Sequence, residues 1–274
     1  MFKDITIGQY VPGNSFIHRL DARVKIILAL VYVVALFLIH NPVSYVLFTI
    51  FTVTAILVSR VPLGFIVRGL KPMMFIIVFT AVINLFMTPG EIVYWSFPIT
   101  ANWKIQITQE GIVSAVLMLF RLLYLMIGTS LLTLTTSPLM LTDGIENLLK
   151  PFSKIGVPSH EIAMMMTIAI RFIPTLTEET DKIIKAQMAR GADFESGNIV
   201  KRAKAMLPLL VPLFVSAFRR ADELSVAMES RCYHGGHNRT RMKQMKVTRL
   251  DAYGSVIMGV FCVMLLLIEL FVRF

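Results

Sequence analysis

Two arginines in this chain each stand between small residues at the end of a predicted helix. The two tripeptides are Ala189-Arg190-Gly191 and Ser230-Arg231-Cys232. Small neighbours let a guanidinium group enter a groove without obstruction, and its planar fork can bind a carboxylate through two hydrogen bonds. The alternative for either site alone is that the arginine complements the helix dipole, which contributes under about 1 kcal/mol. We therefore regard the two arginines as candidate docking tips.

The first tip ends a predicted helix that begins at Ser159. The segment "SHEIAMMMTIAIRFIPTLTEETDKIIKAQMARG" has a helical pattern broken once by Pro174. Thr175 and Glu178 have the spacing of a capping box, so we expect a kinked helix or one that starts twice. Gly191 follows the last periodic residue, as a glycine at a helix C-terminus does.

The second tip ends a predicted helix over residues 198–232, which would be about 50 Å long at 1.5 Å per residue. Its centre, residues 206–218, is apolar but contains Pro208 and Pro212 and has basic flanks. We expect this centre to lie on or partly in the membrane and not to form a sixth span. A short amphipathic helix over residues 138–152 is expected before both long helices.

The composition places these helices in a membrane protein. Hydrophobic residues make up 56% of the 274 positions and charged residues 16%, and the mean hydropathy is +0.71. A typical soluble domain has roughly a quarter charged residues. We expect an all-α polytopic membrane protein with about five transmembrane helices and a cytoplasmic or membrane-surface block of long helices. The five apolar stretches are Ile26–Ile39, Val43–Val58, Met73–Met87, Ile112–Leu134 and Val256–Val272.

The distribution of basic residues predicts the orientation. Lysines and arginines gather before the first stretch and before the third, whereas residues 88–111 carry one lysine, two glutamates and several aromatic residues. By the positive-inside rule the N-terminus and the long segment 135–254 are cytoplasmic and the C-terminus is outside. Topology then explains most of the net charge of +10, and no nucleic-acid partner is needed.

The same pattern predicts three regions in a multi-pass protein of the cell membrane. They are a membrane domain over residues 1–134, a cytoplasmic domain over residues 135–250 and a final transmembrane helix over residues 251–274.

Two further arginines fall in apolar surroundings. Arg121 lies near the middle of the fourth stretch, where a charge normally faces a partner or a cavity, and we favour a structural or interface role. Arg171 in "IAIRFIP" is expected to meet a lipid headgroup or a helix terminus.

Metal binding and catalysis have weak support. Cys232, His234 and His237 could bind zinc, but a fourth ligand is missing, so we predict neither a metal site nor a cofactor. No Walker-type loop, His-Glu-x-x-His or Gly-x-Ser-x-Gly motif occurs, so we do not expect an enzyme. A membrane enzyme acting on lipids remains an alternative, with carboxylates at Glu178, Glu179 and Asp181, although dipole stabilisation in a first helical turn explains these more simply.

The combination of these motifs resembles the transmembrane (T) component of energy-coupling factor transporters. The resemblance rests on both arginine tips, on "RFIPTLTEETDKIIKAQM" before the first, on "RRADELSVAMESRCY" around the second and on "YVPGNSFIHRLDARVKI" near the N-terminus. It covers nearly the whole chain. The second tip departs from the family's Ala-Arg-Gly, because Ser230 and Cys232 replace the alanine and the glycine. Their small size preserves the steric argument, and whether a glycine-type turn forms there is left open.

The resemblance implies a membrane scaffold for uptake of a vitamin or a metal ion. Its two arginine tips would enter two ATP-binding-cassette subunits, which hydrolyse ATP, and the membrane lipids would surround it. A separate substrate-binding S component would capture the substrate, with the apolar faces at residues 162–173 and 207–218 as candidate contacts. An ordinary ATP-binding-cassette permease with its own substrate path is the remaining alternative.

Overall fold

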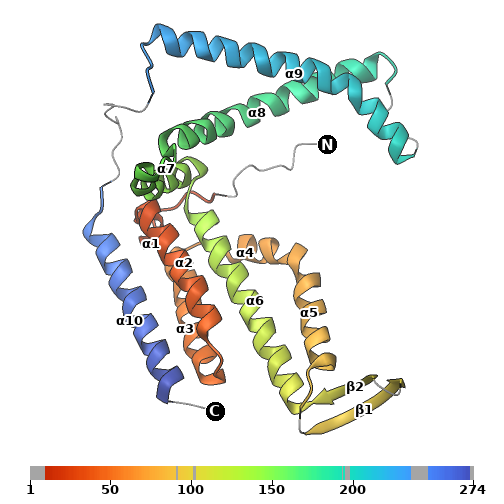
Figure 1. The fold of residues 1–274 in the computed structure, drawn as a ribbon, viewed down its shortest axis with the longest axis vertical. Helices are drawn as coiled ribbons and strands as arrows, with labels where there is room; N and C mark the ends of the chain where they lie inside the picture. Colours follow the sequence, from red (N-terminus) through yellow and green to blue (C-terminus); the bar gives the residue numbers. More distant parts are fainter. Residues whose placement is uncertain are drawn as a thin grey trace. The chain divides into compact units, whose positions relative to one another are not determined.

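The computed structural model describes residues 10–90, 92–100, 103–192, 194, 198–235 and 246–271 (Figure 1). The chain divides into two compact units. The membrane unit comprises the described residues of Gly8–Gly144 and Met245–Phe274, and the crossed-helix unit comprises those of Ile145–Gln244. Helix α7 (Pro138–Leu149) crosses the boundary between them.

The membrane unit confirms the predicted all-α polytopic class. Its elements are α1 (Phe16–Arg19), α2 (Ala22–Leu38), α3 (Pro42–Ser59), α4 (Leu63–Leu70), the 3-10 helix η1 (Lys71–Met73), α5 (Met74–Met87), β1 (Val93–Thr100), β2 (Trp103–Thr108), α6 (Gln109–Thr135) and α10 (Arg249–Phe271). Within the described residues, four helices are long and apolar enough to cross a membrane: α3, the continuous stretch Leu63–Met87, α6 and α10. Helix α2 has 17 residues, which is at the short end of the spanning range.

Capping residues fix where the first two spans begin. The Asp21 side chain accepts a hydrogen bond from the Arg23 backbone N–H, so α2 starts four residues before the apolar stretch. The Asn41 side chain does the same for the Val43 backbone N–H, and Pro42 occupies the first turn of α3. Both caps satisfy helix N–H groups that have no partner within the helix.

Arg121, the charged residue in the fourth predicted span, has its hydrogen-bond partners at the turn between α2 and α3. Arg121 on α6 donates to the carbonyl of Ile39 at 2.7 Å and to the hydroxyl of Tyr45 at 3.1 Å. A cation at the C-terminus of α2 is favourable because helix dipoles end in exposed carbonyl groups. Arg121 thus joins α6 to the α2–α3 turn, and its structural or interface role stays a prediction.

Glu269 on α10 binds the other side of the same turn, where α3 begins. Its two carboxylate oxygens accept hydrogen bonds from the His40 backbone N–H and from the Ser44 hydroxyl, each at 3.0 Å. An anion beside the N-terminus of α3 complements that helix dipole. One side chain from α6 and one from α10 thus hold the α2–α3 hairpin at its closed end.

The core of the membrane unit is aromatic. Phe48 and Phe261 are almost fully buried and their ring centroids lie 5.5 Å apart, so α3 and α10 meet through them. Tyr32 packs beside Phe48 and donates a hydrogen bond to the Tyr124 carbonyl at 3.1 Å. Gly128 lets α2 and α6 approach, because a Cβ atom there would lie 2.3 Å from the Tyr32 ring.

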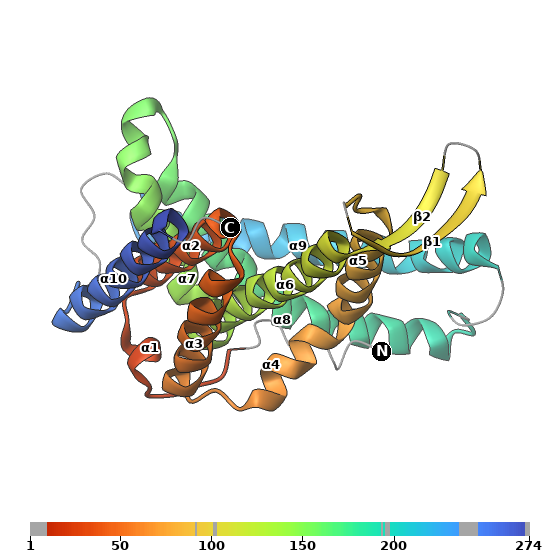
Figure 2. The same ribbon diagram turned by 90° about the horizontal axis from the view of Figure 1, so that it is seen from below.

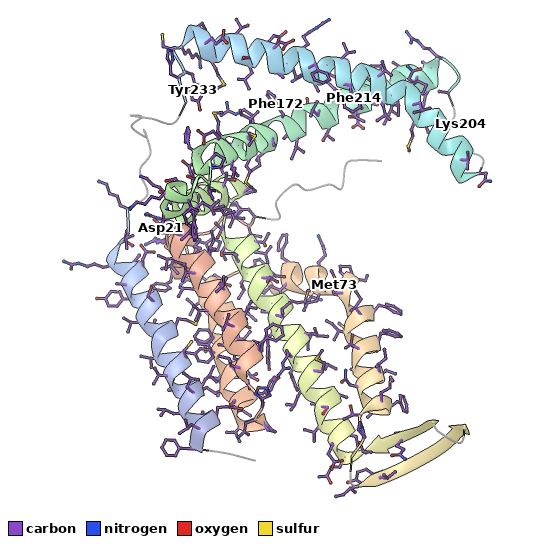
Figure 3. The ribbon with its side chains drawn as sticks, in the orientation of Figure 1. Asp21, Met73, Phe172, Lys204, Phe214 and Tyr233 are labelled. Carbon is purple, nitrogen blue, oxygen red and sulfur yellow. The ribbon has the colours of Figure 1, made fainter. Side chains whose placement is uncertain are left out.

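Residues 10–25 connect the ends of three helices, as Figure 3 shows around Asp21. Buried Asp251 accepts hydrogen bonds from the Thr248 backbone N–H and hydroxyl, and from the Asp21 backbone N–H at 2.7 Å. Buried Lys25 donates to the carbonyls of His18 and Thr135. The N-termini of α2 and α10 and the C-terminus of α6 are therefore fixed together. The segment "HRLDARVK" forms this junction.

The segment between α5 and α6, which has few charges and several aromatic residues, forms a β-hairpin. Strands β1 and β2 pair antiparallel, with Ser96 opposite Gln106 and Phe97 opposite Ile105. Aromatic and β-branched residues favour extended pairing, and that preference applies to this stretch irrespective of its place beside a membrane. Thr108 then caps α6 by accepting the Gly111 backbone N–H.

The crossed-helix unit contains the two predicted long helices. After α7 come the 3-10 helix η2 (Lys150–Ile155), α8 (Ser159–Ala189) and α9 (Ile199–Ser230). Neither α8 nor α9 is among the four helices apolar enough to span, in the part of the chain that the structure describes.

Helix α8 does not start a second time at Pro174. The proline lies inside one continuous helix, and the Thr175 hydroxyl donates to the Phe172 carbonyl at 2.8 Å, so it forms no capping box with Glu178. The interpretation of Glu178, Glu179 and Asp181 as first-turn residues is therefore wrong. A proline removes one backbone hydrogen bond, and the helix continues past that loss.

Candidate functional site: two arginine tips on crossed helices

Helices α8 and α9 contact each other through a polar cluster in their second halves. Glu179 on α8 accepts a hydrogen bond from the Ser216 hydroxyl at 2.8 Å and forms an ion pair with Arg220, both on α9. The hydrogen bond from Ser216 and the charge of Arg220 hold the pKa of Glu179 below its usual value. Figure 1 shows the two helices crossing, and Figure 3 shows Phe214 of α9 in the same region.

The first tip ends α8 in a Schellman turn. The Ala192 N–H bonds to the Gln187 carbonyl and the Gly191 N–H bonds to the Met188 carbonyl, both at 3.0 Å. Gly191 has φ +85°, a left-handed conformation that glycine adopts without steric cost. Ala189 is the last helical residue, and the Arg190 side chain that follows is exposed.

The second tip has the same turn, without a glycine. The Tyr233 N–H bonds to the Met228 carbonyl at 3.0 Å and the Cys232 N–H bonds to the Glu229 carbonyl at 2.9 Å. Cys232 has φ +57°, which is the left-handed region where side chains other than glycine are uncommon. Arg231 is exposed, directly after Ser230, the last residue of α9. The open question about a glycine-type turn is answered: Cys232 forms it.

Both tips lie beyond the contact between the two helices. Arg190 is 11 residues after Glu179, and Arg231 is 15 residues after Ser216 and 11 residues after Arg220. Eleven residues of α-helix rise about 16 Å. Figure 1 shows α8 and α9 running in opposing directions, so the two arginines project from opposite ends of the crossed pair. This arrangement offers two exposed cations, each at the end of a long helix.

The second tip also contacts the start of α8. The Tyr233 hydroxyl lies 3.5 Å from Nε2 of His160, and Nδ1 of that histidine lies 3.1 Å from the Glu146 carboxylate on α7. Figure 3 shows Tyr233 just beyond the end of α9. The sequence interpretation missed His160 and Glu146, since neither belongs to a local motif.

Both long helices expose apolar side chains beside the crossing. On α8 these include Met165, Met166 and Ile173, and on α9 they include Leu207, Leu210, Val211, Phe214, Val215 and Phe218. Apolar residues in this number on exposed helix faces are typical of contact with lipid or with another protein. Arg171 is exposed on α8 among them.

Comparison with known proteins assigns this geometry to a family. The pattern of the CbiQ family, described as cobalt transport protein, matches residues 13–242. The energy-coupling factor transporter transmembrane protein EcfT of Clostridium kluyveri is 59% identical over 257 residues, which are 93% of each chain. The protein of the same name from Bacillus subtilis is 47% identical over 252 residues, 92% of this chain and 93% of its own. The chain belongs to the EcfT family.

As an EcfT protein, the chain is a transmembrane component of an energy-coupling factor transporter, which implies an energy-coupling role. The resemblance inferred from the arginine tips is thereby confirmed. The EcfT of Thermosediminibacter oceani, 56% identical over 261 residues, covers 95% of this chain and 96% of its own length.

The metal motif considered from the sequence, Cys232, His234 and His237, lies only partly within the described residues. Cys232 is exposed on the second tip, and His237 lies outside the described residues. Within the described part, no group of three or more His, Cys, Asp or Glu side chains is placed to hold a metal ion.

Asp251 is the most deeply buried acid that the sequence interpretation missed. Its signal was present as Thr248-x-x-Asp251, the spacing of a capping box at the start of α10. The second hydrogen-bond partner of Asp251 is the Asp21 backbone N–H, which lies 230 residues earlier, so no local pattern contains it.

Proposed function

We propose that this EcfT protein couples two ATP-binding-cassette subunits to a membrane-embedded S component, and that Arg190 and Arg231 each dock into one ATPase. The observation that carries the proposal is the matching turn at the two helix ends, each with an exposed arginine directly after the last helical residue. Two similar ATPase subunits require two similar docking elements, and the crossed pair supplies them. The flanking side chains of Ala189, Gly191, Ser230 and Cys232 are small enough to enter a groove with each arginine.

Rigidity makes the tips suitable for transmitting movement. ATP-dependent closure of two subunits must become a displacement in the membrane, and a helix transmits displacement along its length where a loop does not. The Glu179–Arg220 contact joins α8 to α9, so movement of one tip is transmitted to the other helix. ATP is hydrolysed by the partners, and the chain itself is not an enzyme.

The remaining assignments follow the same scheme. The exposed apolar faces at residues 162–173 and 207–218 contact the S component, which captures a vitamin or a metal ion. The N-terminus and the crossed helices are cytoplasmic and the C-terminus is outside. The regions 1–134, 135–250 and 251–274 act as membrane domain, coupling domain and final span.

Charge reversal at both tips tests the proposal. In the double variant Arg190→Glu, Arg231→Glu, a carboxylate in the ATPase groove meets a like charge, and losing a desolvated ion pair costs about 2–5 kcal/mol. We expect both ATPase subunits to be lost on co-purification and ATP-driven uptake to stop.

The matched control reverses two exposed cations away from the tips, Lys185→Glu on α8 and Arg219→Glu on α9. This variant should retain both ATPases. Retention of the ATPases and of uptake by the tip variant would refute the proposal.

A further inference from the structure

A long groove runs along the outside of the membrane unit. It has a volume of about 570 Å³ and is lined by residues of α1, α2, α3, α6 and α10. Its lining includes Thr54 on α3, Val260 on α10, and Leu28 and Tyr32 on α2. Figure 2 shows α2, α3 and α10 gathered in one part of this unit. All of this lies within one compact unit.

The groove is apolar and has the length of one lipid chain. On α10 its lining extends from Gly254 to Met264 and on α3 from Leu47 to Val58. Ten helical residues rise about 15 Å, which is half of the roughly 30 Å hydrocarbon thickness of a bilayer. The exposed side chains of Thr54, Ile257 and Val260 leave it open at the surface of spanning helices, so its occupant comes from the membrane.

One end of the groove is closed by α1 and is basic. Phe16 and Ile17 of α1 line this end. Arg19 lies two residues before Asp21 and Arg249 two residues before Asp251, and the hydrogen bond between Asp21 and Asp251 places both arginines at the same end. Both arginine side chains are exposed, as is Lys246.

The acids at this end already have partners. Asp21 forms an ion pair with Arg23, and Asp251 accepts hydrogen bonds from backbone N–H groups. The exposed charge at the end of the groove therefore comes from Arg19, Arg249 and Lys246, which suits a phosphate group.

We propose that this groove is a binding site for one anionic phospholipid. One acyl chain lies between α3 and α10, and the phosphate group lies against Arg19 and Arg249 at the α1 end. The lipid completes the packing between α3 and α10, which meet directly through Phe51 and Phe261 with ring centroids 3.9 Å apart. The proposal concerns the membrane unit alone and is independent of ATPase docking.

The first test uses the unaltered protein. The full chain, with whatever partners it retains, is reconstituted into nanodiscs of equal phosphatidylglycerol and phosphatidylcholine, extracted in mild detergent and examined by native mass spectrometry. The expected result is one retained phosphatidylglycerol per chain, at least tenfold preferred over phosphatidylcholine. Equal retention of both lipids, or retention of neither, would overturn the proposal.

Paired variants then locate the site. Thr54→Trp and Val260→Trp fill the groove and should abolish retention, whereas Val53→Trp and Val263→Trp add the same side chain to exposed positions outside the groove and should not. Arg19→Gln with Arg249→Gln should remove the preference for phosphatidylglycerol, and Arg68→Gln on α4 should leave it.

Size-exclusion profiles show whether each tryptophan variant folds, and the arginine pair tests the site without altering the groove. If the filled variants keep the lipid, the lipid does not lie in the groove and the proposal fails. If they also lose a partner protein while the lipid remains, the groove is a protein contact.

Discussion

Cys232 adopts the backbone conformation that glycine adopts at the first tip. Its φ of +57° costs about 1–2 kcal/mol for a residue with a Cβ atom, whereas Gly191 reaches φ +85° freely. The hydrogen bonds of the turn at Tyr233 and Cys232 offset that cost. Small size alone is therefore insufficient at this position, because the side chain must also tolerate a left-handed backbone.

Replacing Cys232 separates these two requirements. Cys232→Gly and Cys232→Ser should leave ATPase binding at the second tip unchanged. Cys232→Val should weaken it roughly tenfold, because a β-branched residue resists a positive φ. The measurement is the affinity of the purified ATPase for the full chain in detergent. Equal affinity of the valine and glycine variants would show that the turn is irrelevant to docking.

At the scale of elements, the Glu179–Arg220 pair holds α8 against α9. Both side chains are partly exposed, at 23% and 30%, so the coupling between them should lie within roughly 0.2–1 kcal/mol. A double-mutant cycle with Glu179→Gln and Arg220→Gln, read from thermal unfolding in detergent at pH 7, measures it. Glu178→Gln, an exposed neighbour on α8, is the control and should change nothing.

The same cycle has a defined pH dependence. Because the folded pKa of Glu179 is depressed below 4.5, its contribution is fully present above pH 4.5 and is lost as the pH falls through the folded pKa. The coupling should therefore be constant from pH 7 to pH 5 and disappear in stronger acid. A coupling that weakens between pH 7 and pH 5 would contradict the ion pair as its source.

Asp251 joins two helix N-termini through one carboxylate. In Asp251→Asn an amide NH₂ replaces one carboxylate oxygen. This NH₂ cannot accept the hydrogen bond from the backbone N–H of Asp21 or of Thr248, so one of the two bonds is lost. Hydrogen bonds to a charged acceptor contribute about 1.5–3 kcal/mol, and we expect a loss of that size in unfolding free energy. Thermal unfolding in detergent measures it, and Asp222→Asn, exposed on α9, is the matched control. An unchanged midpoint for Asp251→Asn would show that this junction does not hold α10.

Local signals in the sequence predicted most helices, and long-range partners account for what they missed. The cap at Asp21, the chain break at Asn41-Pro42 and the C-terminal Gly191 can be predicted from the sequence, because each acts on its own helix end. The partners of Arg121 lie 76 and 82 residues away, and no local pattern contains them. The prediction of a second helix start at Pro174 failed for a different reason, because a proline weakens a helix without having to end it.

At the scale of the whole molecule, the proposed docking function depends on two sites 41 residues apart in sequence having the same local geometry. The sequence showed the likeness of the tripeptides, and their membership of an EcfT protein supports a coupling role. The crossing depends on which residues of α8 and α9 meet, and only the folded chain shows that.

Site-specific photo-cross-linking tests the docking claim most directly. A photoreactive residue at Ala189 or at Ser230 leaves both arginines intact, and the same residue at Lys185 or Arg219 serves as the control on each helix. In native membranes, positions 189 and 230 should each form an adduct with an ATP-binding-cassette subunit, and the control positions should not. Absence of an ATPase adduct at both tips, with the ATPases still bound to the complex, would contradict the account.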